Sequence, residues 1–214
     1  MEVIEQYHKI LTPIDSVHIY CAIEQAGRIA YKSEDRITSG SAEKFIRSIL
    51  QRGHESVIEH FNISVLFVTD RGVTHELVRH RLCAYTQEST RYCNYSKKGM
   101  TFIRPVFWGK DSPEYAVWKD CMERCEFCYN VLLNDSYNRT PQEARSVLPN
   151  SLKTEIVCTA NIREWRHIMI LRTSGATHPQ MQALMLPLLH EFKARLPVLF
   201  DDIKEGYNDT KQNT

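Results

Sequence analysis

The feature that most constrains the fold of this chain is a run of alternating apolar residues after His60. Every second position up to Thr69 is apolar, as shown by Phe61, Ile63, Val65 and Phe67. Successive side chains of a strand point to opposite faces, so this spacing predicts a strand that is buried on one face. The polar residues 70–72 (DRG) end it.

Directly after this strand the pattern becomes helical. The segment 73–81 (VTHELVRHR) has helical spacing and predicts a helix that carries Arg79, His80 and Arg81 at its end, leading into a polar, loop-like segment. Positive side chains are favoured at a helix C-terminus, so part of this clustering has a structural cause.

Other segments complete an α+β pattern. The segment SGSAEKFIRSILQRG around Ser41 predicts an N-capped amphipathic helix with Gly53 just past its end, and residues 154–159 predict a strand. Further helices are expected over residues 115–133, from Pro141 in PQEARSVL, and over 162–171 and 180–196. Strands and helices do not alternate strictly, so we expect an α+β fold rather than a doubly wound sheet. The absence of repeats and linkers favours one domain over residues 1–214, with a polar, frayed tail after about residue 200.

Composition excludes several classes of function. The net charge of +1 provides no global basic field for nucleic acid, and we expect no nucleic-acid partner. No apolar stretch is long enough to span a membrane, so no membrane association is expected. The first residues, MEVIEQYHKI, do not resemble a secretory signal, and seven cysteines form no paired framework. A cytoplasmic location is therefore expected.

A dense polar cluster lies between residues 79 and 91. It contains three arginines, a histidine, an amide, a carboxylate and a hydroxyl: Arg79, Arg81, Arg91, His80, Gln87, Glu88 and Ser89. Guanidinium groups bind phosphate and carbonyl oxygens in a bidentate manner and stay charged, so the cluster suits an anionic ligand. The alternative is a basic surface turn with salt bridges to Glu88.

The spacing of this cluster resembles the signature of the flavin-dependent thymidylate synthases. That signature is Arg-His-Arg, seven variable residues and Ser, matched here by RHRLCAYTQESTRY from Arg79 to Tyr92. HESVIEH from His54, ARSVLP with Arg145, TANIREWRHIMILR up to Arg172, and HPQ from His178 follow the family order. The resemblance covers roughly residues 40–200.

The resemblance implies an activity and an assembly. The family methylates dUMP to dTMP, taking the carbon from 5,10-methylenetetrahydrofolate and the hydride from reduced FAD, which NADPH reduces. It also implies a single domain with a central, mostly antiparallel sheet flanked by helices, and a homotetramer whose active sites are shared between subunits. Such a site explains why the chain has no Rossmann or P-loop fingerprint.

The resemblance also assigns residues, and no metal site. Arg172 is the catalytic candidate, because a fixed cation beside the pyrimidine favours its ionised form, and Ser89 is expected beside dUMP. The residues expected to bind dUMP are Glu76, Leu77, Val78, Arg79, Gln87, Glu88, Ser89, Thr90, Arg91, Arg145 and Arg172. Those expected to bind FAD are Ser56, Arg79, His80, Arg81, Gln87, Asn161, Arg163, His167 and His178.

The chain departs from the family pattern at three positions and leaves alternatives open. Thr86-Gln87 replaces the usual Asn-Glu, so Glu88 is a second candidate for the missing carboxylate, and Ala84 replaces a common Ser. The C-x3-C-x2-C segment of Cys121, Cys125 and Cys128 has iron–sulfur spacing, but its helical setting favours a buried apolar stripe.

Three further hypotheses compete for residues in or near the motif. The arginine cluster together with Tyr85, Tyr92 and Tyr95 could form a single-stranded nucleic-acid surface. Cys83 and Cys93 flank the motif, but the resemblance gives neither a catalytic role. His54 and His60 are six apart, which does not fit the spacing of a helical zinc motif.

Overall fold

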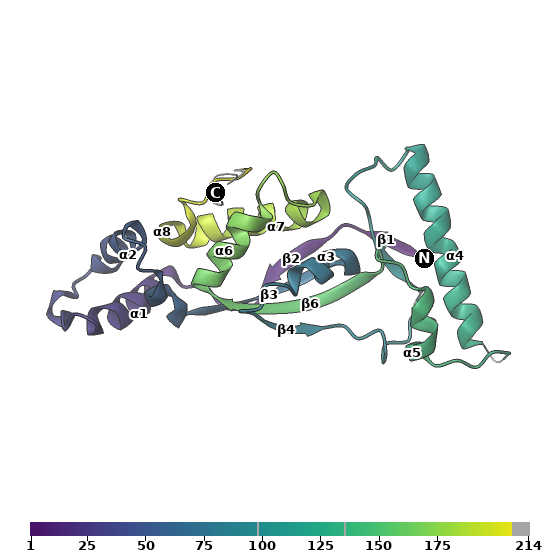
Figure 1. Cartoon of the computed structure of the whole chain (residues 1–214), viewed down its shortest axis with the longest axis horizontal. Coiled ribbons are helices and arrows are strands. Elements are labelled where there is room, and N and C mark those ends of the chain that lie inside the picture. Colours follow the sequence, from purple (N-terminus) through teal and green to yellow (C-terminus); the bar gives the residue numbers. More distant parts are fainter. Residues whose placement is uncertain (98, 135, 207–214) are drawn as a thin grey trace, which may run out of the picture. The chain divides into compact units, whose positions relative to one another are not determined.

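The computed structural model describes residues 1–97, 99–134 and 136–206 (Figure 1). The chain divides into two compact units. Unit 1 contains Met1–Lys9, Leu66–Arg79 and Tyr85–Val157, and unit 2 contains Ile10–Val65, His80–Ala84 and the described residues from Cys158 onward. The single domain expected from the sequence remains a proposal.

The larger sheet confirms the predicted α+β class with antiparallel strands. Its strand order is β2, β3, β6, β4, with bounds Tyr7–Ile10, Asn62–Asp70, Lys153–Asn161 and Ala84–Gln87. The alternation in β3 is confirmed, since Ile63, Val65 and Phe67 are fully buried. Two of these strands run straight into helices, because Asp70 accepts from the Val73 N–H at 2.7 Å and Asn161 from the Glu164 N–H at 2.9 Å.

Unit 2 consists of helices together with its share of the sheet. They are α1 (Ser16–Ile29), η1 (Glu34–Arg36), α2 (Ser41–Gln51), η2 (Glu55–His60), α6 (Ile162–Arg172), α7 (Pro179–Arg195) and α8 (Pro197–Phe200). Figure 1 shows α1 beside α2, and the two helices contact each other. Trp165 anchors the core: its indole N–H donates to the Ile63 carbonyl at 2.9 Å, and its ring contacts that of Phe192.

Unit 1 has its own core around the long helix α4. Its elements outside the larger sheet are β1 (Glu2–Ile4) and β5 (Thr101–Ile103), which pair in parallel, α3 (Arg71–Leu77), α4 (Pro113–Leu133), α5 (Pro141–Ala144) and η3 (Arg145–Val147). Pro141 opens α5 as predicted. The face of α4 that packs inward carries Trp118, Met122 and Tyr129. Within the described residues, no helix combines the length and apolar character needed to cross a membrane.

Two local predictions around the motif were wrong. The helix predicted over residues 73–81 ends at Leu77, and because Val78 and Arg79 are exposed, burial does not favour another turn. Arg79, His80 and Arg81 therefore follow the helix rather than belong to it. The segment predicted as a loop contains the short strand β4, which its polar composition concealed.

Two further predictions need correction. The α2 N-cap is Gly40, with φ at 79°, and no side chain caps this end. The end at Gly53 is confirmed as a Schellman motif, because His54 donates to the Ile49 carbonyl and Gly53 to that of Leu50. The tail up to residue 206 is not frayed, since Ile203 is buried and Asp202 forms an ion pair, while residues 207–214 lie outside the described part.

Candidate active site

The first residue of the motif, Arg79, belongs to unit 1 and follows helix α3. Arg79 is exposed, and its backbone N–H donates to the Glu76 carbonyl at 3.3 Å. Leu77, expected at the nucleotide, has a fully buried side chain, and its carbonyl accepts the Tyr85 hydroxyl at 2.7 Å. Val78 is 39% exposed. Arg79 is thus the residue of this stretch whose charge is presented to solvent.

The two candidates for the missing carboxylate are both held by unit 1. The Gln87 amide nitrogen donates to the hydroxyls of Thr74 at 2.9 Å and Thr154 at 3.2 Å. The Thr74 hydroxyl already donates to the Arg71 carbonyl at 3.0 Å, so towards residue 87 it can only accept, which suits an amide donor rather than a carboxylate. The sequence difference from the usual Asn-Glu is therefore matched by its surroundings.

Glu88 is occupied by partners on both carboxylate oxygens. The Tyr95 hydroxyl donates to one at 2.7 Å and the Lys153 ammonium to the other at 3.1 Å. The Glu88 N–H donates to the Glu155 carbonyl at 2.8 Å. Burial, followed by the bond to Glu88, raises the pKa of Tyr95, so its hydroxyl stays a donor. Glu88 therefore fastens this segment to the sheet.

The turn after Glu88 holds Ser89, Thr90 and Arg91. The Ser89 carbonyl accepts N–H groups from Tyr92 and Cys93, and its hydroxyl accepts the Arg91 N–H at 3.3 Å. Thr90 is buried, whereas Arg91 is exposed and donates from Nε to Gln142 at 2.8 Å. Gln142 lies in α5, one turn before Arg145, so unit 1 brings Arg91 to the element that leads into Arg145.

Of the motif, residues 80–84 belong to unit 2, and His80 is the buried one among them. The Arg172 Nε donates to His80 Nε2 at 3.0 Å, and His80 Nδ1 lies 3.6 Å from Glu164 Oε1. His80 is only 7% exposed. Burial, then the positive charges of Arg172 and His167, lower the pKa of His80 to about 4, so it is neutral at pH 7. Burial also raises the pKa of Glu164.

A cavity of about 610 Å³ in unit 2 gathers three of the predicted FAD residues. Asn161, Arg163 and His167 line it together with Glu55, Glu59, Leu82, Glu164, Arg166 and Ile170. Arg163 donates to Glu59 at 2.6 Å, while the side-chain oxygen of Asn161 caps α6. The cavity thus combines a helix N-terminus, two guanidinium groups and an imidazole with three carboxyl groups.

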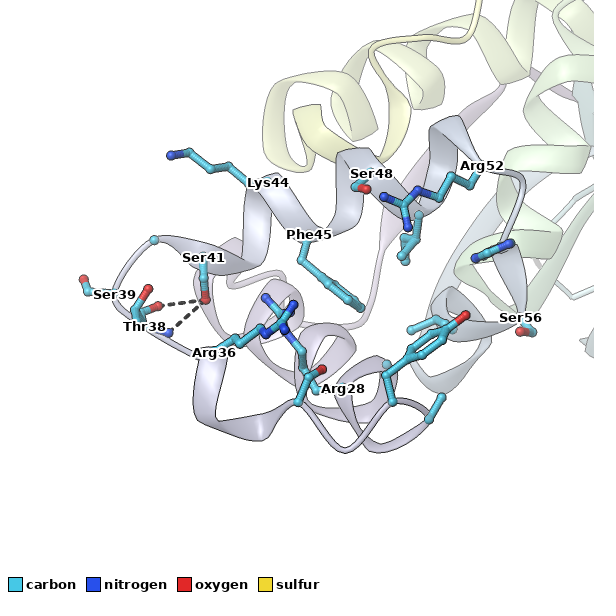
Figure 2. Close-up of a pocket in the computed structure, with 18 residues that line it drawn as sticks. Arg28, Arg36, Thr38, Ser39, Ser41, Lys44, Phe45, Ser48, Arg52 and Ser56 are labelled. Carbon is cyan, nitrogen blue, oxygen red and sulfur yellow. Dashed lines mark hydrogen bonds between the residues drawn. The ribbon is translucent and has the colours of Figure 1, made fainter.

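Ser56 lies at a different cavity of unit 2, about 970 Å³ in volume (Figure 2). Arg28, Arg36, Lys44 and Arg52 line this cavity. Arg28 is held by Glu24 at 2.7 Å and lies 4.7 Å from the Phe45 ring centroid. Since Glu55 lines the smaller cavity and Ser56 the larger, these adjacent residues of η2 face different hollows.

The remaining predicted residues are not gathered in these cavities. Arg81 is exposed just after His80, and His178 is exposed at the start of α7. Neither residue lines the two hollows described above.

The cysteine triplet is on a helix, as predicted, but its predicted burial was wrong. Cys121 and Cys128 are exposed and Cys125 is half-buried. Larger apolar side chains on the neighbouring stripe, Trp118 and Met122 among them, take the inward face of α4. Among the described residues, the three-ligand group with all atoms within 4.8 Å is His80, Glu164 and His167, not these thiols.

Comparison with known proteins gives a consistent result. The family model described as thymidylate synthase complementing protein matches residues 18–198. The flavin-dependent thymidylate synthase of Pyrococcus furiosus is 32% identical over 196 residues, covering 90% of this chain and 77% of that protein. That of Geobacter sulfurreducens is 30% identical and covers 86% of this chain and 82% of its own length. The chain belongs to the flavin-dependent thymidylate synthase family.

A solved structure supports the fold. The UMP/dUMP methylase PolB from Streptomyces cacaoi, bound with 5-Br dUMP, superposes with a TM-score of 0.78. The alignment covers 94% of this chain and 96% of that chain at 22% identity. This likeness confirms the fold expected for a member of the family.

Sequence reasoning missed several side chains that hold the family motif in place. Glu164 beside His80, Thr74 and Thr154 beside Gln87, and Lys153 and Tyr95 on Glu88 had no assigned site role. Glu164 stood inside the matched segment TANIREWRHIMILR, which was the available signal. The other partners carry no motif, because they act through tertiary contacts.

Proposed function

We propose that this chain catalyses the reductive methylation of dUMP to dTMP. The carbon donor is 5,10-methylenetetrahydrofolate, and FAD reduced by NADPH is the hydride donor. The observation that carries the proposal is the Arg172 guanidinium, held by neutral, buried His80 inside the family motif. A cation fixed in this way suits the task of favouring the ionised form of a pyrimidine ring.

The exposed arginines supply the substrate site in this proposal. Arg79, Arg91 and Arg145 bind the anionic nucleotide, with Glu76, Leu77, Val78, Gln87, Glu88, Ser89 and Thr90 forming the surrounding segment. Leu77 contributes through its backbone, since its side chain is in the core. Gln87 and Glu88 act by holding the segment rather than by offering a carboxylate, because their side chains already have protein partners. Ser89 lies in the same turn and is proposed to contact dUMP.

The residues around the smaller cavity fit a flavin dinucleotide. The α6 N-terminus, Arg163 and His167 provide donors suited to a pyrophosphate, with Asn161 beside them. Ser56, Arg79, His80, Arg81, Gln87 and His178 complete the proposed FAD set. Bound FAD supplies the hydride, while this chain binds and orients its substrates and excludes water. Ser56 faces a different cavity of the protomer, which supports sites shared between subunits of a homotetramer.

We further propose that the chain acts in the cytoplasm as a single domain without nucleic-acid or membrane partners. All seven cysteines are free thiols, in keeping with a reducing compartment. The aromatic surface required by the nucleic-acid alternative is poorly supported, because Tyr85 and Tyr95 direct their hydroxyls to Leu77 and Glu88. Of the three tyrosines, this leaves Tyr92, which is 77% exposed, to stack on a nucleic-acid base.

The first experiment is an absorbance spectrum of the purified protein after incubation with FAD and desalting, followed by addition of dUMP. Retained flavin bands that shift with dUMP are expected, and UMP serves as the matched control for the 2′-hydroxyl. Formation of dTMP is then measured under anaerobic conditions with NADPH and 5,10-methylenetetrahydrofolate. A protein that retains no flavin and whose spectrum ignores dUMP would refute the proposal.

Two parallel assays separate the alternatives. Iron and sulfide are measured on anaerobically purified protein, where stoichiometric iron would favour a cluster at the cysteine triplet. Salt-sensitive RNA binding without flavin would favour a nucleic-acid surface. The oligomeric state is measured by light scattering, and a monomer with full activity would contradict the shared-site proposal.

A further inference from the structure

The contact between Arg172 and His80 fixes where the imidazole carries its proton. A guanidinium N–H can only donate, so His80 Nε2, 3.0 Å from Arg172 Nε, must accept through its lone pair. A neutral imidazole has one protonated nitrogen, and in His80 this is then Nδ1. The lowered pKa of His80, at about 4, agrees with a neutral ring at pH 7.

The other ring nitrogen faces Glu164. Its Oε1 lies 3.6 Å from His80 Nδ1, which is longer than a hydrogen bond but close enough for a charge to act on the ring. Both residues are only 7% exposed, and water therefore screens this interaction weakly. A carboxylate at this position favours the tautomer with its proton on Nδ1.

We propose that Glu164 is a positioning residue for Arg172 and acts through His80. The carboxylate selects the Nδ1–H tautomer of His80, which leaves Nε2 to accept from Arg172 and fixes the orientation of the guanidinium. Glu164 stands near the start of α6 and Arg172 is its last residue, so one rigid helix carries both ends of this chain of contacts. The kinetic part of this inference rests on the proposed function.

A metal site made from the same residues makes the opposite demand. The ligand atoms of His80, Glu164 and His167 lie within 4.8 Å of one another, as a metal ion would require. If the metal bound Nδ1, the proton of neutral His80 would move to Nε2. Two N–H donors, from His80 and Arg172, would then face each other at 3.0 Å. The tautomer of His80 therefore distinguishes the two arrangements.

The direct test is nitrogen NMR of protein labelled with ¹⁵N-histidine, with His80 assigned from a His80→Gln variant. We expect a protonated Nδ1 and a lone pair on Nε2 in the wild-type protein. Glu164→Gln removes the charge and should populate the Nε2–H form. A wild-type Nε2–H tautomer, a tautomer unchanged in Glu164→Gln, or loss of the Nδ1–H form on addition of stoichiometric Zn²⁺ would each overturn the proposal.

Kinetics supply the second readout. Glu164→Gln should lower kcat for dTMP formation about 10-fold to 100-fold, as expected for a misplaced catalytic group, with little change in KM for dUMP. Glu123→Gln makes the same charge change at an exposed position of α4 and should leave kcat unchanged. An equal fall in both variants, or a change in KM alone, would contradict positioning.

A further variant and the NMR result keep the outcomes separate. If Glu164→Gln does not fold, Glu164→Asp retains the charge and should retain the wild-type tautomer, and its loss would count against the proposal. If the tautomer behaves as expected but no dTMP forms under any condition, the proposed function fails while the arrangement of Glu164, His80 and Arg172 stands.

Discussion

Arg79 and Arg145 of unit 1 are held differently from Arg172 and Arg166 of unit 2. Arg79 and Arg145 are exposed, and within the described part of the chain their side chains form no hydrogen bond or ion pair. Arg172 is half-buried and fixed by a buried histidine, and Arg166 is buried and paired with Asp202. Exposed cations are well hydrated and suited to capture of an anion, whereas a fixed cation needs little rearrangement during chemistry. We therefore propose that the arginines of unit 1 bind the anionic nucleotide and that unit 2 carries the catalytic cation, and the experiments below test this contrast.

The largest effect is expected for Arg172→Ala. Removal of one preorganised charge from a catalytic site typically costs 10²-fold to 10³-fold in kcat, so dTMP formation should fall by about this factor. The measurement is initial rate at saturating dUMP, with flavin retention followed by absorbance. Arg195→Ala, in the last turn of α7 beside Glu191, is the control. A fall in kcat of less than about threefold would contradict the proposal that unit 2 carries the catalytic cation.

The pH dependence of stability tests the burial of His80. Its pKa is lowered from 6.5 to about 4, so between these values the unfolded chain binds a proton that the folded chain does not. Stability should therefore fall as pH decreases from about 6.5 to 4, by up to about 3 kcal/mol, and then level off. Urea unfolding at several pH values should show this slope in the wild-type protein and lose it in His80→Gln.

Three neighbours of His80 must be considered in that experiment. The positive charges of Arg172 and His167 act with burial on His80, whereas Glu164 has a raised pKa and contributes with the opposite sign. Comparing the slopes with and without His80 in a Glu164→Gln background therefore removes the contribution of the Glu164 carboxyl group. Equal slopes with and without His80 would show that this site is not held as a buried, neutral ring.

Asp202→Ala tests whether Arg166 has a structural role, in contrast to the catalytic role proposed for Arg172. Asp202 accepts from both terminal nitrogens of Arg166 at 2.7 Å, and Arg166 is 6% exposed. Breaking such a pair leaves a buried charge, but Asp202 is itself largely exposed, so we expect a loss of about 2 kcal/mol. The free energy of unfolding in urea measures it, with exposed Asp201→Ala as the control. A change in kcat without a change in stability would contradict a structural role for Arg166.

Arg145→Ala should give the smallest effect, confined to binding. Loss of one charged contact to a phosphate is expected to raise KM for dUMP about tenfold, less at high salt, with no change in melting temperature. Arg139→Ala removes an exposed arginine from the preceding segment and serves as the control. A fall in melting temperature would show that Arg145 has a structural partner and would weaken the contrast.

The sequence by itself determined the regular elements and the family. Period-two alternation marks β3 because a strand exposes alternate faces, and helical spacing marks α4, α6 and α7 over nearly their full lengths. The motif from Arg79 to Arg91 indicated the family, because its spacing depends only on local order along the chain.

Only the tertiary structure decided how the site residues are held. His80 meets Arg172 across 92 residues, and Arg166 meets the tail across 36, so no local pattern encodes either contact. The early end of α3, strand β4 and the exposure of the cysteines were likewise settled by competition for the core. Larger apolar side chains took the buried face of α4, and the polar strand β4 gained its backbone partners from the sheet. Local propensity proposes such elements, but burial and long-range hydrogen bonds select among them.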